Sequence, residues 1–115
     1  MSAVGATTDD EAIVLVAVFR ARPETVDELR DRLISMVGYT RAEPGCQQYD
    51  LHEYPDDPYR FAFVETWASR EALAAHDETE HVRAILADAP RLTAGPLEIH
   101  RLRPITRHDR RPGGS

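Results

Sequence analysis

The order of apolar and helix-like segments predicts an α+β fold of the ferredoxin-like type, with the element order βαββαβ and an antiparallel sheet. Three observations predict it. A continuous apolar run near the start of the chain has the valine content of a strand, two later segments repeat their apolar residues at helical spacing, and a Pro-Asp-Asp-Pro turn separates two strand-like segments. Such a sheet carries its helices on one face.

The first strand is expected at Ile13–Arg20, because this run is almost wholly apolar, as in a strand that is covered on both faces. A helix should begin next to Pro23, since proline suits the first helical position and acidic residues follow it at the positive end of the helix dipole. Leucines at 29 and 33 continue the helical spacing. Pro44 predicts that this helix ends near Arg41 to Glu43.

Two strands joined by a turn are expected at Cys46–Tyr54 and Arg60–Trp67. In the second strand both sets of alternate residues are largely apolar, so both faces should be covered. We favour the register in which Tyr49, Phe63 and Trp67 point toward the helices. A slip of one residue would exchange the two faces of each strand, and the sequence alone leaves that alternative open.

The second half of the chain is predicted to supply a helix in two pieces and a last strand. Ser69 should cap the first piece, which carries Leu73 and His76 on one face. The second piece is expected from about Glu78 to Ala89, ending before the next proline. A final strand is predicted at Leu97–Leu102.

Length and composition limit the organisation of the chain. Its 115 residues predict one domain over residues 12–103, between a disordered leader at 1–11 and a disordered tail at 104–115. The single cysteine, Cys46, excludes an intrachain disulfide and fits a reducing, cytoplasmic setting.

Charge and apolar content also exclude some partners. The formal net charge of −6 disfavours nucleic acid, because phosphate binding needs a basic face. The longest apolar run is too short to span a bilayer, so no membrane partner is expected. The face of the sheet without helices should carry Ala62 and Val64, which a monomer would expose. We therefore expect a homodimer, in which two sheets pack face to face.

Three motifs and a later histidine resemble the antibiotic biosynthesis monooxygenase family. In chain order they are Glu43-Pro44-Gly45-Cys46-x-x-Tyr49, Glu65-x-Trp67, and Glu71-Ala72-Leu73-x-x-His76, followed by His81. The resemblance covers roughly residues 12–102. It implies a dimeric α+β barrel with a pocket between the sheet and the helices of each protomer. The family includes cofactor-independent monooxygenases of aromatic polyketides, quinol monooxygenases, haem-degrading enzymes and processors of small signalling molecules.

The resemblance implies a cofactor-independent monooxygenase that oxidises a small phenolic, quinol or polyketide-like substrate with O₂. By position it places the catalytic residues at His76 and Trp67. The substrate-binding residues would then be Tyr49, Phe63, Glu65, Leu73 and Val82. Non-oxidative binding of a small molecule, or isomerisation of a signalling molecule, is the alternative on the same scaffold. Haem degradation is disfavoured, because that branch uses an asparagine on its first strand and this sequence contains none.

Each candidate also has a purely structural interpretation. Trp67 can serve the core, since a tryptophan buries a large area whether or not a ligand touches it. His76 could act as a base, orient a carbonyl group, or pair with Glu80 one turn on. Glu65 lies on a mostly buried face, where a carboxylate must be paired or protonated. His52 falls on the dimer face or in the pocket, according to the register.

The segment from His76 to His81 contains two histidines and suggests a metal site. The two residues are five positions apart, which is about 140° around a continuous helix. They would then point to different faces, unlike the pair at i and i+4 in a zinc-binding helix. No metal is therefore predicted, although a break in the helix would reopen the question.

Overall fold

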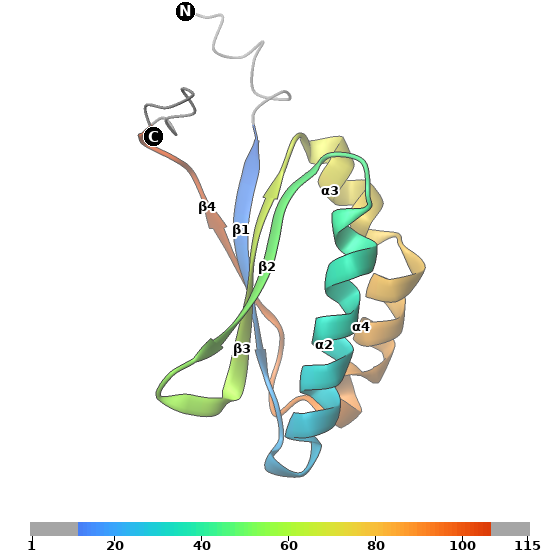
Figure 1. The fold of residues 1–115 in the computed structure, drawn as a ribbon, viewed down its shortest axis with the longest axis vertical. Helices are drawn as coiled ribbons and strands as arrows, with labels where there is room; N and C mark the ends of the chain where they lie inside the picture. The colour runs from blue at the N-terminus through green and yellow to red at the C-terminus, as the bar shows by residue number, and fades with distance from the viewer. Residues whose placement is uncertain (1–11, 107–115) are drawn as a thin grey trace, which may run out of the picture.

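The computed structural model describes residues 12–106, so the expected leader at 1–11 and positions 107–115 of the expected tail lie outside it. Four strands form one sheet in the order β2-β3-β1-β4, in which every neighbouring pair is antiparallel. The elements are β1 (Ile13–Arg20), η2 (Pro23–Thr25), α2 (Val26–Arg41), β2 (Cys46–Tyr54), β3 (Asp57–Trp67), α3 (Arg70–Asp77), α4 (Glu80–Leu92) and β4 (Glu98–Leu102). The helices lie on one face of the sheet (Figure 1). The predicted ferredoxin-like fold is confirmed.

The register of the sheet decides which side chains meet the helices. Ala17 of β1 lies opposite Phe63 of β3, which in turn lies opposite Leu51 of β2. The face toward the helices carries most of the core, and it includes Tyr49 and Trp67 as expected. The predicted register, with Tyr49, Phe63 and Trp67 toward the helices, is thereby confirmed.

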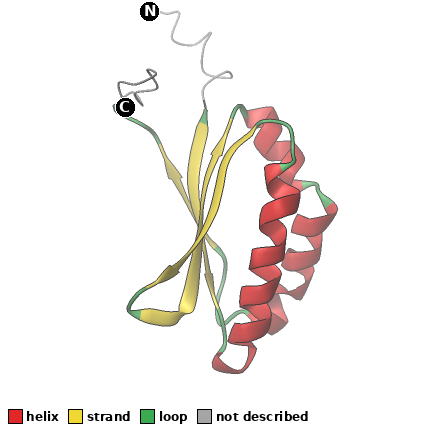
Figure 2. Ribbon diagram, viewed as in Figure 1, coloured by secondary structure: helices red, strands yellow, loops and turns green. Residues whose placement is uncertain are grey.

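The other face of the sheet has no described helix over it (Figure 2). Valines at 14, 16 and 18 of β1 alternate there with Ala62 and Val64 of β3. His52 lies on the same face at the edge strand and is exposed. The expectation of an apolar face without helices is confirmed. The expected exposure of Ala62 was wrong, because this small side chain is buried within the single chain, while Val64 is partly exposed.

Capping side chains fix the helix starts that matter most for the site. The Ser69 hydroxyl accepts a hydrogen bond from the backbone N–H of Ala72 at 3.1 Å, as expected for the cap of α3. The Thr79 hydroxyl accepts from the N–H of Val82 at 3.4 Å and caps α4. Two separate caps mean that α3 and α4 are separate helices rather than one.

Two predicted boundaries were wrong. The helix α4 continues through Pro90 to Leu92, although the proline removes one helical hydrogen bond, because Leu92 is fully buried and the N–H of Thr93 still bonds to the carbonyl oxygen of Ala89 at 2.8 Å. The strand β3 begins at Asp57 rather than Arg60, since Asp57 pairs with Tyr54 and leaves only two residues in the turn. No helix within residues 12–106 is long and apolar enough to cross a membrane.

Gly45 allows the turn between α2 and β2 to lie close against α3. Its φ of 85° is in the region that favours glycine. A Cβ at this position would lie 2.5 Å from the Cβ of Ala72. The carbonyl oxygen of Gly45 accepts a hydrogen bond from the N–H of Ala68 at 2.8 Å. The turn therefore brings Glu43, just before it, next to α3.

Candidate functional site

A cavity of about 480 Å³ lies between the sheet and the helices. Apolar side chains from β1, β3, α2, α3 and α4 form most of its wall, among them Phe19, Met36 and Ile85. At its rim, Leu86 and Ile99 are about half exposed, so the cavity opens between α4 and β4. Its volume is in the range of pockets that take small organic molecules.

Four acidic or basic side chains interrupt this apolar wall: Glu65, His76, Asp77 and Arg101. Glu65 and His76 are buried, whereas Asp77 and Arg101 are exposed at the rim. Although Asp77 is exposed overall, partial removal of its carboxyl group from water raises its pKa, against the opposing effect of His76. The sequence analysis did not single out Arg101, because a lone arginine in a late strand carries no motif.

The structure brings six of the seven predicted site residues to the cavity. Its lining includes Tyr49, Phe63, Glu65, Leu73, His76 and Val82. Trp67 is not among the lining residues: it is fully buried and lies behind His76, with the two ring centroids 4.5 Å apart. Trp67 thus supports the imidazole and does not form the pocket wall that the sequence suggested.

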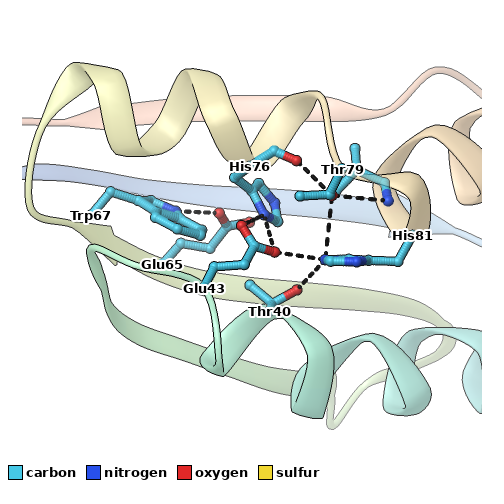
Figure 3. Close-up of polar contacts among 8 residues, drawn as sticks. Thr40, Glu43, Glu65, Trp67, His76, Thr79 and His81 are labelled. Atoms are coloured by element: carbon cyan, nitrogen blue, oxygen red, sulfur yellow. Dashed lines mark hydrogen bonds and ion pairs between the residues drawn. The ribbon is translucent and has the colours of Figure 1, made fainter.

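Glu65 and Trp67 are joined by a buried hydrogen bond. The indole N–H donates to Oε1 of Glu65 at 2.9 Å (Figure 3). Burial raises the pKa of Glu65 to about 7, the bond from Trp67 opposes this shift, and the nearby carboxylates of Asp77 and Glu43 add to it. A carboxyl group of this kind can give or take a proton near neutral pH.

Tyr49 packs between Phe63 and His76. Its ring stacks on Phe63 with centroids 4.4 Å apart and meets His76 edge-on at 5.7 Å. Burial, reinforced by the charge of Glu65, raises the pKa of the Tyr49 hydroxyl, so this group stays protonated. Tyr49 can therefore donate a hydrogen bond but does not serve as a base.

Glu43 fixes the orientation of the His76 ring. Both carboxylate oxygens of Glu43 lie 3.1 Å from Nδ1 of His76 (Figure 3). A carboxylate only accepts hydrogen bonds, so Nδ1 carries the proton and donates it to Glu43. Within residues 12–106, Nε2 of His76 makes no hydrogen bond. In the neutral ring with its proton on Nδ1, Nε2 keeps its lone pair, and the ring lines the cavity.

The expected partner of His76 was wrong. Glu80 is exposed and forms no hydrogen bond with the ring, whereas Glu43 reaches it from the turn after α2, 33 residues earlier. Glu43 belonged to the first motif but had received no role. A Pro-Gly pair directly after an acidic residue was the available signal, because a tight turn there can bring the acid against the next helix.

The interruption between α3 and α4 brings His81 to the same carboxylate. Nε2 of His81 lies 2.6 Å from Oε2 of Glu43, and the two imidazole centroids are 6.0 Å apart. The expectation that the two histidines point to different faces was wrong, since it assumed a continuous helix. Thr79, the cap of α4, was the residue in the sequence that could have indicated the break.

Two threonine hydroxyls complete this polar group. Thr40 Oγ1 and Thr79 Oγ1 lie 3.2 and 3.3 Å from Nε2 of His81, and Thr79 also donates to the carbonyl oxygen of His76 at 2.7 Å. We call Glu43, His76, His81, Thr40 and Thr79 the Glu43 cluster. The other four residues of the cluster lie on the side of the His76 ring that carries Nδ1.

Comparisons with known proteins agree with this architecture. Residues 12–88 match the family model described as Antibiotic biosynthesis monooxygenase. YcnE of Bacillus subtilis, whose name proposes a monooxygenase, is 35% identical over 89 residues, which cover 77% of this chain and 94% of that protein.

Solved structures show the same fold. The structure of Rv0793 from Mycobacterium tuberculosis has a TM-score of 0.80 at 31% identity and covers 86% of this chain and 100% of that chain. PA3566 from Pseudomonas aeruginosa also has a TM-score of 0.80 at 31% identity, over 85% of this chain and 98% of that one.

Proposed function

The chain belongs to the antibiotic biosynthesis monooxygenase family, and from this premise we propose that it is a cofactor-independent monooxygenase of a small phenolic, quinol or polyketide-like substrate. The observation that carries the proposal is the apolar cavity with a buried imidazole and a buried carboxyl group on its wall. An aromatic substrate of a few rings fits about 480 Å³.

His76 is proposed as the base. Its Nε2 takes the proton of the substrate hydroxyl, or of an activated carbon–hydrogen bond, and the resulting imidazolium is stabilised by Glu43 through Nδ1–H. Trp67 holds the ring from behind, so it is proposed as a positioning residue. Glu65 and the Tyr49 hydroxyl can hydrogen-bond to the substrate oxygens.

The deprotonated substrate supplies all the electrons. It passes one electron to O₂, the two radicals combine into a carbon–oxygen bond, and the peroxide then loses water. One oxygen atom stays on the substrate and the other leaves as water, so a CH₂ group becomes C=O without another reductant. The apolar wall formed by Phe63, Leu73 and Val82 would keep bulk water from the peroxide.

Oxygen uptake tests this proposal. The protein is mixed with a series of naphthoquinols and anthrone-type polyketides in an oxygen electrode, and product is analysed after labelling with ¹⁸O₂. We expect at least one substrate to consume O₂ above the buffer rate and to incorporate one labelled atom. If none does so, the oxidative function is wrong.

An isomerase is the second candidate, favoured by one observation. Glu65 and His76 both line the cavity, and the pKa of Glu65 is about 7, so one group could donate a proton while the other accepts it. Such a reaction consumes no O₂. Turnover of an enolisable ketone without oxygen uptake, lost in His76→Gln, would favour it over the monooxygenase.

We also propose that the protein acts as a homodimer through the face of the sheet without helices. Val14, Val16 and Val64 on this face are only partly covered by the chain itself. A charge at the centre of a packed apolar face is costly. Val16→Glu is therefore expected to turn a dimer into a monomer in sedimentation analysis, whereas an unchanged sedimentation coefficient would show that this face is not the interface.

A further inference from the structure

The Glu43 cluster presents three groups of the types that bind transition metals. Glu43 supplies a carboxylate oxygen, and His76 and His81 each supply a ring nitrogen. These ligand atoms all lie within 4.8 Å of one another, although they come from the turn after α2, from α3 and from α4. Two histidines and one carboxylate form a recurrent ligand set for Zn²⁺ and for Fe²⁺.

We propose that Glu43, His76 and His81 bind one divalent transition-metal ion, coordinated through Nδ1 of His76 and Nε2 of His81. In a tetrahedral zinc site the ligand atoms lie about 3.3 Å apart, given metal–ligand distances of about 2.0–2.2 Å. The Glu43 oxygens already lie 3.1 Å from His76 and 2.6 Å from His81. Small side-chain rotations would therefore suffice to form the site.

The surroundings of the three ligands support a bound ion. His76 is buried, and the side chain of Glu43 is only 12% exposed, so bulk water competes weakly for their donor atoms. The hydroxyls of Thr40 and Thr79 lie 3.2 and 3.3 Å from Nε2 of His81, where they could hold a metal-bound water. These features differ from those of a solvated surface pair.

An ion could reach the cluster without passing through the substrate cavity. A second depression of about 430 Å³ is lined by Glu43 and Thr79, together with residues of the Gly45 turn and of α3. It shares none of its lining residues with the cavity. Metal and substrate would therefore enter by different routes, the metal next to Glu43 and the substrate through the cavity.

A bound ion would change what His76 presents to the cavity. Coordination at Nδ1 replaces the proton there, so a neutral ring must carry its proton on Nε2. The other ring nitrogen, Nε2, then changes from an acceptor to a donor. This consequence rests on the proposed function of His76, and it predicts that the metal-loaded protein loses the base and turns over more slowly.

Cobalt binding tests the site without reference to turnover. Untagged protein is titrated with CoCl₂ and followed by visible absorption, with Zn²⁺ as competitor. We expect saturation at one Co²⁺ per chain, with the intense bands of a four- or five-coordinate ion that Zn²⁺ removes. Absence of saturable absorption in the wild-type protein would overturn the proposal.

Variants and nuclear magnetic resonance locate the ion. Glu43→Gln and His81→Gln should each weaken Co²⁺ binding at least tenfold. The matched control is His100→Gln, because exposed His100 pairs with Glu98 at 3.3 Å but has no second histidine. If Co²⁺ binds the two cluster variants as tightly as wild type, the ligand assignment is wrong.

Ring ¹⁵N shifts of the wild-type protein need no variant. Zn²⁺ should shift the His76 and His81 signals and leave His52 and His100 unchanged, and shifts confined to His52 or His100 would overturn the site. Bound Zn²⁺ should also lower the turnover of an accepted substrate at least tenfold. Unchanged turnover at saturating Zn²⁺ would leave the metal site in place and overturn the proposed role of His76 as the base.

Discussion

The two sides of the His76 ring have opposite chemistry. On the Nδ1 side, Glu43 and His81 form a compact polar group with the two threonines. On the other side lies an apolar cavity in which Glu65 is the buried carboxyl group. The difference indicates a division of work: the polar side fixes the ring and its proton, and the cavity side leaves a nitrogen available to a ligand.

The two sides also differ in how the chain builds them. The cavity wall comes from alternating strand residues, whose positions follow from the register of the sheet, and from residues at helical spacing on the helices. The Glu43 cluster is held by a positive-φ turn at Gly45 and by a break between two helices at Glu78–Thr79. A change in the cluster should therefore alter the orientation of His76, and a change in the wall should alter what the cavity accepts.

The largest effect is expected from removing the imidazole that both sides share. His76→Gln keeps a polar side chain but has no titrating nitrogen, so turnover of an accepted substrate should fall about 10²–10⁴-fold. The rate of O₂ uptake measures it. His52→Gln, an exposed histidine on the face without helices, is the control and should turn over normally. Equal loss in both variants would contradict the assignment.

The next effect concerns the buried carboxyl group of the cavity side. Burial in the folded chain raises the pKa of Glu65 from 4.5, the value expected in the unfolded chain, to about 7. The folded state therefore binds the extra proton between these values, and stability falls as the pH rises from about 4.5 to 7. The full loss in the free energy of unfolding is roughly 3 kcal/mol, since each pKa unit corresponds to about 1.4 kcal/mol.

Glu65→Gln should remove this loss, because the amide cannot ionise and its oxygen can still accept from Trp67. Urea unfolding of both proteins at pH 5 and pH 8 measures it. The free energy of unfolding of the wild type should fall by roughly 3 kcal/mol more than that of the variant between the two pH values. An equal change in stability for both proteins between the two pH values would show that burial does not raise the pKa of Glu65.

A smaller effect is expected from the polar side. Glu43→Gln keeps the shape of the side chain but offers only one carbonyl oxygen to two imidazoles, so the His76 ring should lose its fixed orientation. We expect kcat to fall roughly 10- to 100-fold while KM changes little, because a misplaced base costs the reaction more than binding. A rise in KM at constant kcat would place Glu43 in substrate binding instead.

The smallest effect concerns the hydrogen bond behind the ring. Trp67→Phe removes the indole N–H that favours the charged form of Glu65, so the pKa of Glu65 should rise above its wild-type value. The variant should lose about 1 kcal/mol of stability at pH 5 and more at pH 8. If the loss of stability is the same at both pH values, the hydrogen bond from Trp67 does not lower the pKa of Glu65.

The sequence predicted the cavity side far better than the polar side. Alternation in the second hairpin strand placed Phe63, Glu65 and Trp67 on the core face, and helical spacing placed Leu73 and His76 opposite them. These patterns are local, because each depends on the period of a single strand or helix.

The polar side depends on contacts between distant segments, which periodicity does not report. Glu43 and His76 are 33 residues apart, and His81 joins them only because α3 ends at Asp77 and α4 begins at Glu80. Extending one helix across this break placed the two histidines on different faces and selected Glu80 as the partner. The position of Trp67 behind the ring likewise depends on how α3 packs on β3.

The most direct test is the protonation state of the His76 ring in the metal-free protein. Long-range ¹H–¹⁵N correlation spectra distinguish a ring protonated on Nδ1 from one protonated on Nε2. The geometry predicts a proton on Nδ1, donated to Glu43, and a bare Nε2 toward the cavity, and Glu43→Gln should weaken this preference. A proton on Nε2 in the wild-type protein would contradict the account, because the cavity would then contain no imidazole base.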